Sequence, residues 1–274
     1  MSSTAGGPLC APLTPNAAKP RPPAVTRVRA EPAQRSATGD PVALLVAALW
    51  ANLSALADPG VAAGQQSYMK TAEPYLGIRA PVVRTTVNTL VRAAPLLPRQ
   101  DWERAVRELY SKATHREHRY AALELARHRR YILFRDGAIA PLVHDVVTGG
   151  QWWDLVDSAA HVLGDGLVAD RAAGGTDLTR IVANWAIESD VWLRRVAVIS
   201  QLGHRGDTDL GLLEHCLDAQ LGRSEFWLRK ASGWALRELS HSNPAWVLGY
   251  LAERADAVAP LTRREALKAI TRAT

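Results

Sequence analysis

The stretch QWWDLVD, Gln151–Asp157, places two adjacent tryptophans beside two aspartates, and these residue types can do chemistry on a sugar. At 100° per residue on a helix, Trp152 joins the apolar residues between positions 155 and 163 in one stripe, which predicts a core face. Trp153 and Asp157 then lie side by side on another face. In an arbitrary helical protein, the commoner arrangement has Trp153 packed on a neighbouring helix and Asp157 capping a helix or paired with an arginine.

Two later segments repeat one another. Trp192-Leu193-Arg194-Arg195 recurs as Trp227-Leu228-Arg229-Lys230, 35 residues further on, and each copy opens a helix. Paired helices at this period are typical of HEAT-like α-solenoids, which bind partners on a concave face. The repeat therefore predicts an all-α, HEAT-like α-solenoid whose concave face is the binding surface.

From Asp40 onward, the sequence pattern predicts that all the elements that position these residues are helices. Asp40-Pro41 has the pattern of an N-cap followed by proline at the first helical position, and the helix after it is expected to stop at Asp58. A short helix is expected around 65–72. Residues 1–39 hold seven prolines and no apolar period, which predicts a disordered Pro/Ala/Arg-rich tail before one domain over 40–274.

Charge and cysteine content exclude several classes of protein. The net charge of +6 comes mostly from residues 1–39, where five basic residues face Glu31 alone. Two cysteines, Cys10 and Cys216, form neither a disulfide framework nor a CxxC site. No apolar run approaches the roughly 20 residues of a membrane span. We expect a cytoplasmic monomer with no membrane partner and no metal or organic cofactor.

If equivalent helices line one face, their tryptophans, cations and carboxylate meet in a groove. Guanidinium groups match phosphate oxygens, and tryptophan faces pack on sugars and cations. A carboxylate beside a sugar can stabilise an oxocarbenium-like transition state, and a cationic N-alkylpurine leaves as a neutral base without an acid. The predicted groove contains Trp153, Asp157, Arg195, Lys230, Trp234 and Arg237.

Four stretches carry a family resemblance: YMKTAEPYLGIRAP, QWWDLVD, VWLRRVAVISQL, and FWLRKASGWALRELSHSNPAWV with LTRREALKAI. Together, over about residues 42–272, they resemble the AlkD-like DNA alkylation repair glycosylases built of HEAT-like repeats. The resemblance implies base excision of 3-methyladenine-type and 7-methylguanine-type lesions from double-stranded DNA. It also implies bulky adducts for some members, and catalysis without flipping the base into a pocket.

The resemblance also assigns roles by position. It implies that Trp153 and Trp234 flank the lesion deoxyribose, that Asp157 is the catalytic carboxylate, and that Arg195 holds the DNA backbone. Tyr68 matches a tyrosine near the DNA.

Several basic residues and histidines lie outside the matched motifs. Arg79 and Arg84 are predicted DNA contacts at a patch with fewer cations than the family often has, and Arg79 is equally compatible with a solvated charge. The basic run from Lys112 to Arg135 is either a solvated helix face or an edge that follows phosphates. Its histidines, His115, His118 and His128, are expected at the surface rather than on a metal.

The sequence thus predicts a monofunctional DNA glycosylase for cationic N3- and N7-alkylated purines, because no lysine is placed as an obvious Schiff-base nucleophile. Two alternatives stay open. One is a self-resistance glycosylase tuned to a bulky DNA-alkylating natural product. The other is a HEAT-like module that binds DNA or protein without catalysis.

Overall fold

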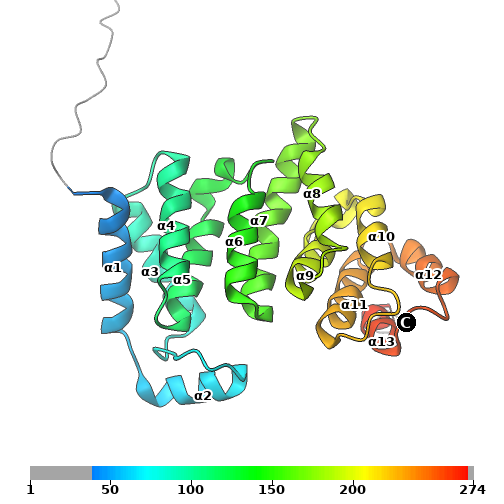
Figure 1. The fold of residues 1–274 in the computed structure, drawn as a ribbon, viewed down its shortest axis with the longest axis horizontal. Helices are drawn as coiled ribbons and strands as arrows, with labels where there is room; N and C mark the ends of the chain where they lie inside the picture. The colour runs from blue at the N-terminus through cyan, green and yellow to red at the C-terminus, as the bar shows by residue number, and fades with distance from the viewer. Residues whose placement is uncertain (1–38, 271–274) are drawn as a thin grey trace, which may run out of the picture. The chain divides into compact units, whose positions relative to one another are not determined.

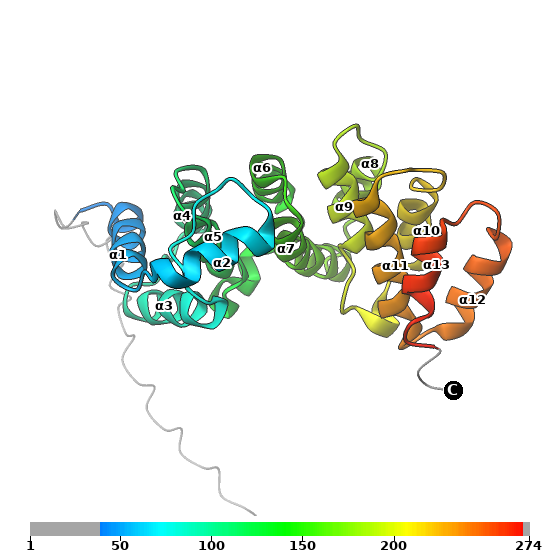
Figure 2. The ribbon, with the colours of Figure 1, turned by 90° about the horizontal axis from the view of Figure 1, so that it is seen from below.

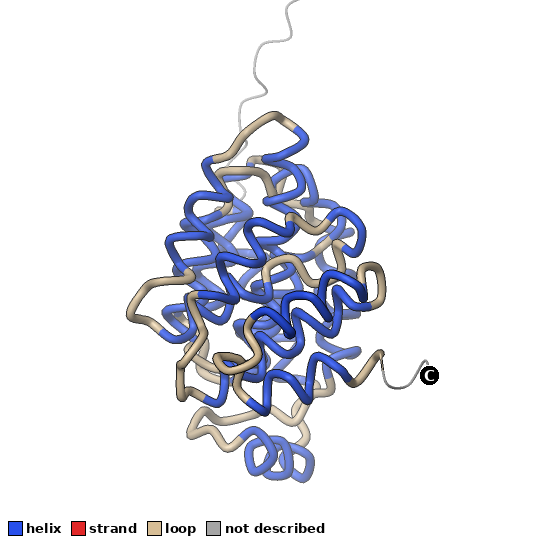
Figure 3. Tube along the Cα trace, turned by 90° about the vertical axis from the view of Figure 1, so that its right-hand side faces the viewer, coloured by secondary structure: helices blue, strands red, loops and turns tan. Residues whose placement is uncertain are grey.

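The computed structural model describes residues 39–270, and within that range it contains helices and connecting loops but no strand (Figures 1 and 3). The all-α prediction is confirmed. The tail predicted at 1–39 lies outside the described residues except for Gly39. The elements are α1 Pro41–Ala55, α2 Pro59–Met69, α3 Ala80–Ala93, α4 Arg99–Ser111, α5 Arg116–Arg127, η1 Arg129–Phe134, α6 Ala140–Gly150, α7 Trp153–Ala172, α8 Asp177–Trp185, α9 Val191–Ile199, η2 Arg205–Asp207, α10 Leu210–Asp218, α11 Phe226–Ser240, α12 Pro244–Glu253 and α13 Pro260–Leu267.

Aspartate–proline pairs start the first two helices. The Asp40 carboxylate accepts the Val42 backbone N–H at 3.2 Å, as the sequence pattern predicts. Asp58 caps α2 in the same way, with Pro59 at the first helical position. The expectation of a short helix at 65–72 is therefore wrong at both ends, because Asp58-Pro59 begins a helix as well as ending the previous one.

The helices form two layers. In one layer α3, α5, α7, α9, α11 and α13 contact one another in that order, while α1, α4 and α6 contact one another in the other. Helices of the first layer also pack on helices outside it, as α5 on α4, α7 on α6 and α9 on α10. Figure 1 shows the helices arrayed from α1 at one end to α12 and α13 at the other, with α2 below the row. This is the arrangement of an α-solenoid, in which each repeat buries its apolar face against its neighbours.

The 35-residue repeat corresponds to one helix pair. Trp192 and Trp227 occupy the second position of α9 and α11, and their rings lie 5.8 Å apart. Ion pairs join successive repeats at similar separations. Arg107 reaches Asp145, 38 residues on, at 2.7 Å, and Arg254 reaches Asp218, 36 residues back, at 2.6 Å.

Helix α2 leaves the layered arrangement and runs across the ends of neighbouring helices (Figure 2). The connector after it is held by Glu117, whose buried carboxylate accepts the backbone N–H groups of residues 76, 77 and 78 at 2.8–3.0 Å. Gly77 has φ +89°, and a Cβ there would lie 1.9 Å from the Asp58 carbonyl oxygen. Only glycine fits this position, so the backbone of the connector can follow only one course here.

The apolar side chains of α1 pack into the hydrophobic core. Val42, Leu45 and Leu49 of α1 are buried, and α1 packs on α3 and α4. In the described part of the chain no single helix has the length and apolar character to cross a membrane; α1 and α2 satisfy that test only jointly, across a bend of 104°.

Candidate active site

The start of α7 presents Trp153 and Asp157 to the surface. Gln151 has φ +37°, in the left-handed region, and turns the chain between α6 and α7. Leu155 and Val156 are fully buried and fix the rotation of the helix about its axis. Trp153 and Asp157 therefore lie together on a half-buried face, as the helical pattern predicts.

Asp157 is held by a two-pronged ion pair. Nε and Nη2 of Arg195 donate to its two carboxylate oxygens at 2.8 and 2.9 Å, and Nη1 donates to the Trp227 carbonyl at 2.7 Å. Arg195 is 3% exposed. Burial raises the pKa of Asp157 above its ordinary value, against the opposing effect of Arg195. The carboxylate is thus fixed in direction and weakly hydrated.

A cleft of about 740 Å³ opens above this pair. The structure brings seven of the residues singled out from the sequence to its walls: Tyr68, Trp153, Asp157, Arg195, Lys230, Trp234 and Arg237. They come from α2, α7, α9 and α11, and the last three of these helices are consecutive in one layer. Sequence reasoning missed five further lining residues: Met69, Lys70, Trp152, Phe226 and Trp227.

Three tryptophans form an aromatic cluster beside the carboxylate. The ring centroids of Trp152, Trp192 and Trp227 lie 5.8–6.1 Å from one another. The helical pattern predicts Trp152 in the core, but its side chain lines the cleft as well as packing on the core. It precedes the helix as its N-cap residue, so the helical angle does not apply to it. Its Nε1 donates to the Met69 carbonyl at 3.1 Å and fastens the end of α2 to the start of α7.

The two cations of α11 share one anion. Lys230 and Arg237 pair with Glu265 of α13 at 2.7 and 3.0 Å. Burial opposes ionisation of Glu265, yet the hydrogen bonds from Lys230 and Lys268 lower its pKa to about 2. Arg195 and Lys230 hold equivalent places in the repeat, but Arg195 turns back to α7 whereas Lys230 turns forward to α13.

Arg79 and Arg84 lie away from this cleft. Arg79 is exposed at the N-cap of α3, and Arg84 is exposed and pairs with Glu124 at 3.2 Å. The structure does not bring them to the cleft, so their contact with DNA stays a prediction.

Part of the basic run between Lys112 and Arg135 is held in internal contacts. Arg116 is 1% exposed and pairs with both Glu73 and Asp154, and Arg135 is buried beside Asp165 at 3.3 Å. For these two arginines neither a solvated face nor a phosphate-following edge is correct. A buried guanidinium needs acceptors, and distant parts of the chain supply them.

The expectation of surface histidines is wrong for His118. Its ring is buried and lies 5.5 Å from the ring of Trp50, and burial lowers its pKa to about 4. Among residues 39–270 no group of three or more His, Cys, Asp or Glu side chains is arranged to hold a metal ion.

Comparison with known proteins relates this site to a family. A family model described as DNA alkylation repair enzyme matches residues 49–270. A solved structure described as a predicted DNA alkylation repair enzyme from Enterococcus faecalis is similar, with 29% identity and a TM-score of 0.62 over 77% of this chain and 95% of that one. The search of curated proteins found no match. With the family model covering most of its length, the chain belongs to the DNA alkylation repair enzyme family.

Proposed function

We propose that the protein is a monofunctional DNA glycosylase. It hydrolyses the N-glycosidic bond of cationic N3- and N7-alkylated purines in duplex DNA and leaves an abasic site for base excision repair in the bacterial cytoplasm. One observation carries the proposal. A carboxylate, Asp157, is fixed by Arg195 at the wall of a cleft that also contains Trp153 and Trp234.

The substrate supplies its own leaving group. As the C1′–N bond breaks, its electron pair neutralises the positive charge of the alkylated base, so no acid is required. Positive charge then develops on the deoxyribose, and the Asp157 carboxylate stabilises it in a weakly hydrated setting. Water forms the new bond to C1′ and loses a proton to solvent.

Asp157 can orient that water while paired. Each carboxylate oxygen accepts one N–H from Arg195, and each keeps a second lone pair. Trp153 and Trp234 pack on the sugar, which holds C1′ near the carboxylate without a pocket for a flipped base.

Arg195 acts first as a positioning residue. Three of its five N–H donors are used on Asp157 and on the Trp227 carbonyl. The prediction that it also contacts the DNA backbone rests on the two remaining donors. Lys230, Arg237 and Tyr68 line the cleft and would meet the DNA there, whereas Arg79 and Arg84 would contact it outside the cleft.

The test is base release from duplex DNA containing N7-methylguanine, measured with enzyme in excess. Asp157→Asn is expected to keep duplex affinity and lose about 10²-fold or more in rate, the usual scale for removing one stabilising group. Asp165→Asn, on the same helix and also paired with an arginine, is the matched control and should retain the rate. Release by Asp157→Asn at the wild-type rate would overturn the assignment. Binding with no release by the wild type would instead indicate a non-catalytic DNA-binding module.

A further inference from the structure

Helix α7 is joined to the helices on both sides of it by two ion pairs of the same kind. Arg195 of α9 reaches Asp157 across 38 residues of sequence, and Arg116 of α5 reaches Asp154 across the same interval in the other direction. Both arginines are buried, at 3% and 1% exposure. Helices α5 and α9 each contact α7 within one layer. The pair on the α9 side holds the carboxylate of the proposed reaction, and the pair on the α5 side holds the residue next to Trp153.

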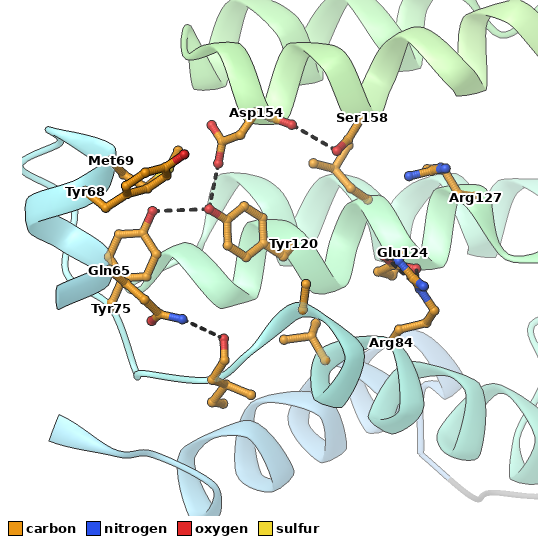
Figure 4. A pocket seen from close by; sticks show the side chains of 14 residues that line it. Gln65, Tyr68, Met69, Tyr75, Arg84, Tyr120, Glu124, Arg127, Asp154 and Ser158 are labelled. Carbon is orange, nitrogen blue, oxygen red and sulfur yellow. Dashed lines mark hydrogen bonds and ion pairs between the residues drawn. The ribbon is translucent and has the colours of Figure 1, made fainter. Parts of the chain in front are cut away.

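The Asp154 carboxylate accepts hydrogen bonds from two side chains of α5. Arg116 donates to one oxygen at 2.5 Å, and the Tyr120 hydroxyl donates to the other at 2.6 Å. Burial, followed by the charge of Asp154, raises the pKa of Tyr120, so its hydroxyl stays protonated. Figure 4 shows the Tyr120 hydroxyl between Asp154 and the hydroxyl of Tyr75. Arg116 also donates to Glu73 in the connector after α2, so one guanidinium joins the connector, α5 and the first turn of α7.

The first turn of α7 has no side-chain cap of its own. Its N-cap residue, Trp152, makes no capping hydrogen bond. Helix α9 differs, because Asp190 accepts the backbone N–H groups of Trp192 and Leu193 at 2.7 and 3.1 Å. In α7 the acidic residue of the first turn is Asp154, and its carboxylate binds α5 instead of the helix end. The contacts of Asp154 therefore help to fix the direction in which α7 begins.

Asp154 also lies between the two residues of α7 that line the cleft. It follows Trp153 directly, and Asp157 comes one helical turn later, where side chains at i and i+3 are neighbours. Burial is the main cause of the raised pKa of Asp157, and the negative charge of Asp154 adds to it. The position and the charge of Asp154 thus both bear on Asp157.

We propose that Arg116 and Asp154 are positioning residues for the reaction, because their ion pair fixes the first turn of α7 so that the Trp153 ring and the Asp157 carboxylate face the deoxyribose together. Neither Arg116 nor Asp154 lines the cleft, so they act through the two residues that do. The inference rests on the proposed function, since the sugar in the cleft requires this alignment. A displacement of about 1 Å in such a site costs about 10²-fold in rate.

A pH measurement on Asp157 must account for the charged and titratable groups around it. On α7 itself these are Asp154 and His161. The cleft adds further groups from the end of α2, from α9 and from α11: Tyr68, Lys70, Arg195, Lys230 and Arg237. On the side of α5 they are Arg116, Tyr120 and Arg127. Lysine, arginine and tyrosine side chains keep one charge state between about pH 4 and 8. Burial lowers the pKa of His161, so a direct titration of the Asp157 carboxyl is needed to tell the two groups apart.

Asp154→Asn tests the inference. Asparagine has the same shape and keeps an oxygen for Tyr120, but it removes the charge. With enzyme in excess, release of N7-methylguanine from duplex DNA should fall about tenfold, and duplex affinity should stay within about twofold of the wild type. The pH dependence of release should also move to lower pH, because ionised Asp157 loses a negative neighbour and Arg116 loses a partner. A purely structural role would not produce that shift.

Asp165→Asn is the matched control, because Asp165 lies on the same helix beside buried Arg135. It should leave rate, affinity and pH dependence at the wild-type values. Tyr120→Phe is a milder variant that removes one hydrogen bond to Asp154 and keeps the ion pair, and it should slow release about threefold. A wild-type rate in either test variant, or a slower rate in Asp154→Asn with unchanged pH dependence, would overturn the inference.

A carbon NMR titration of the Asp157 carboxyl in the free protein separates this inference from the proposed function, because it needs no substrate. The signal is assigned by its loss in Asp157→Asn. Its midpoint should lie at lower pH in Asp154→Asn than in the wild type, and at the wild-type pH in Asp165→Asn. If the midpoint moves but the wild type releases no base, the proposed function fails and the link between Asp154 and Asp157 stands. If the wild type releases base and the midpoint does not move, the inference fails and the proposed function stands.

Discussion

The pairing of Asp157 with Arg195 makes a quantitative prediction for Arg195→Met. Methionine fills similar space but removes three hydrogen bonds, two to the carboxylate and one to the Trp227 carbonyl. Removing one partner of a buried ion pair costs about 3–5 kcal/mol. The Asp157 side chain is 16% exposed and can take up a proton, so we expect the lower end, about 3 kcal/mol. For a domain of this size that lowers Tm by about 6–12 °C.

The sign of the pH dependence follows from the direction of the pKa. Burial already raises the pKa of Asp157, and loss of Arg195 removes the main effect that lowers it. A carboxyl group whose pKa is higher in the folded than in the unfolded protein destabilises the fold once pH exceeds its ordinary value. Arg195→Met should therefore lose more stability at pH 8 than at pH 5. If Asp157 acts in its ionised form, as proposed, base release by Arg195→Met should begin at higher pH than in the wild type.

Thermal unfolding at the two pH values and single-turnover release across pH measure these effects. Arg135→Met is the matched control, because Arg135 is also buried and pairs with Asp165 on the same helix. It should lower Tm without moving the pH dependence of release. An unchanged pH dependence of release in Arg195→Met would show that Arg195 does not control the ionisation of Asp157.

Two other predictions concern α2 and the rim of the cleft. Gly77→Ala should destabilise the protein by about 1–3 kcal/mol in thermal unfolding, since it combines positive φ with a clash against the Asp58 carbonyl; an unchanged Tm would contradict the single path of the connector. Glu265→Gln should free Lys230 and Arg237 for phosphate, strengthening duplex binding and steepening its salt dependence by about one to two phosphate contacts. A salt slope equal to that of the wild type would place these cations off the DNA.

Much of the fold follows from local patterns. The cap at Asp40, the period between Trp192 and Trp227, and the face shared by Trp153 and Asp157 depend on residues within one helix or one repeat. Such features need no knowledge of distant partners, and the sequence predicts them correctly.

What the sequence could not predict depends on distant partners. Arg116 is buried because Glu73, 43 residues before it, and Asp154, 38 residues after it, converge on its guanidinium. His118 is buried because Trp50 covers it. The start of α2 is a different case, since Asp58-Pro59 carried the same signal as Asp40-Pro41 and could have been recognised.

The sequence left two roles open for Asp157, ion-pair partner or catalytic group; the structure pairs it with Arg195, and the catalytic role stays a prediction. The double variant Asp157→Asn/Arg195→Met tests whether they are one role. If Arg195 acts through Asp157, the double variant should release base no more slowly than Asp157→Asn alone, and it should be more stable than Arg195→Met because no unpaired carboxylate is left buried. If its rate instead falls by the product of the two single effects, Arg195 acts independently on the DNA backbone, as the family resemblance implies.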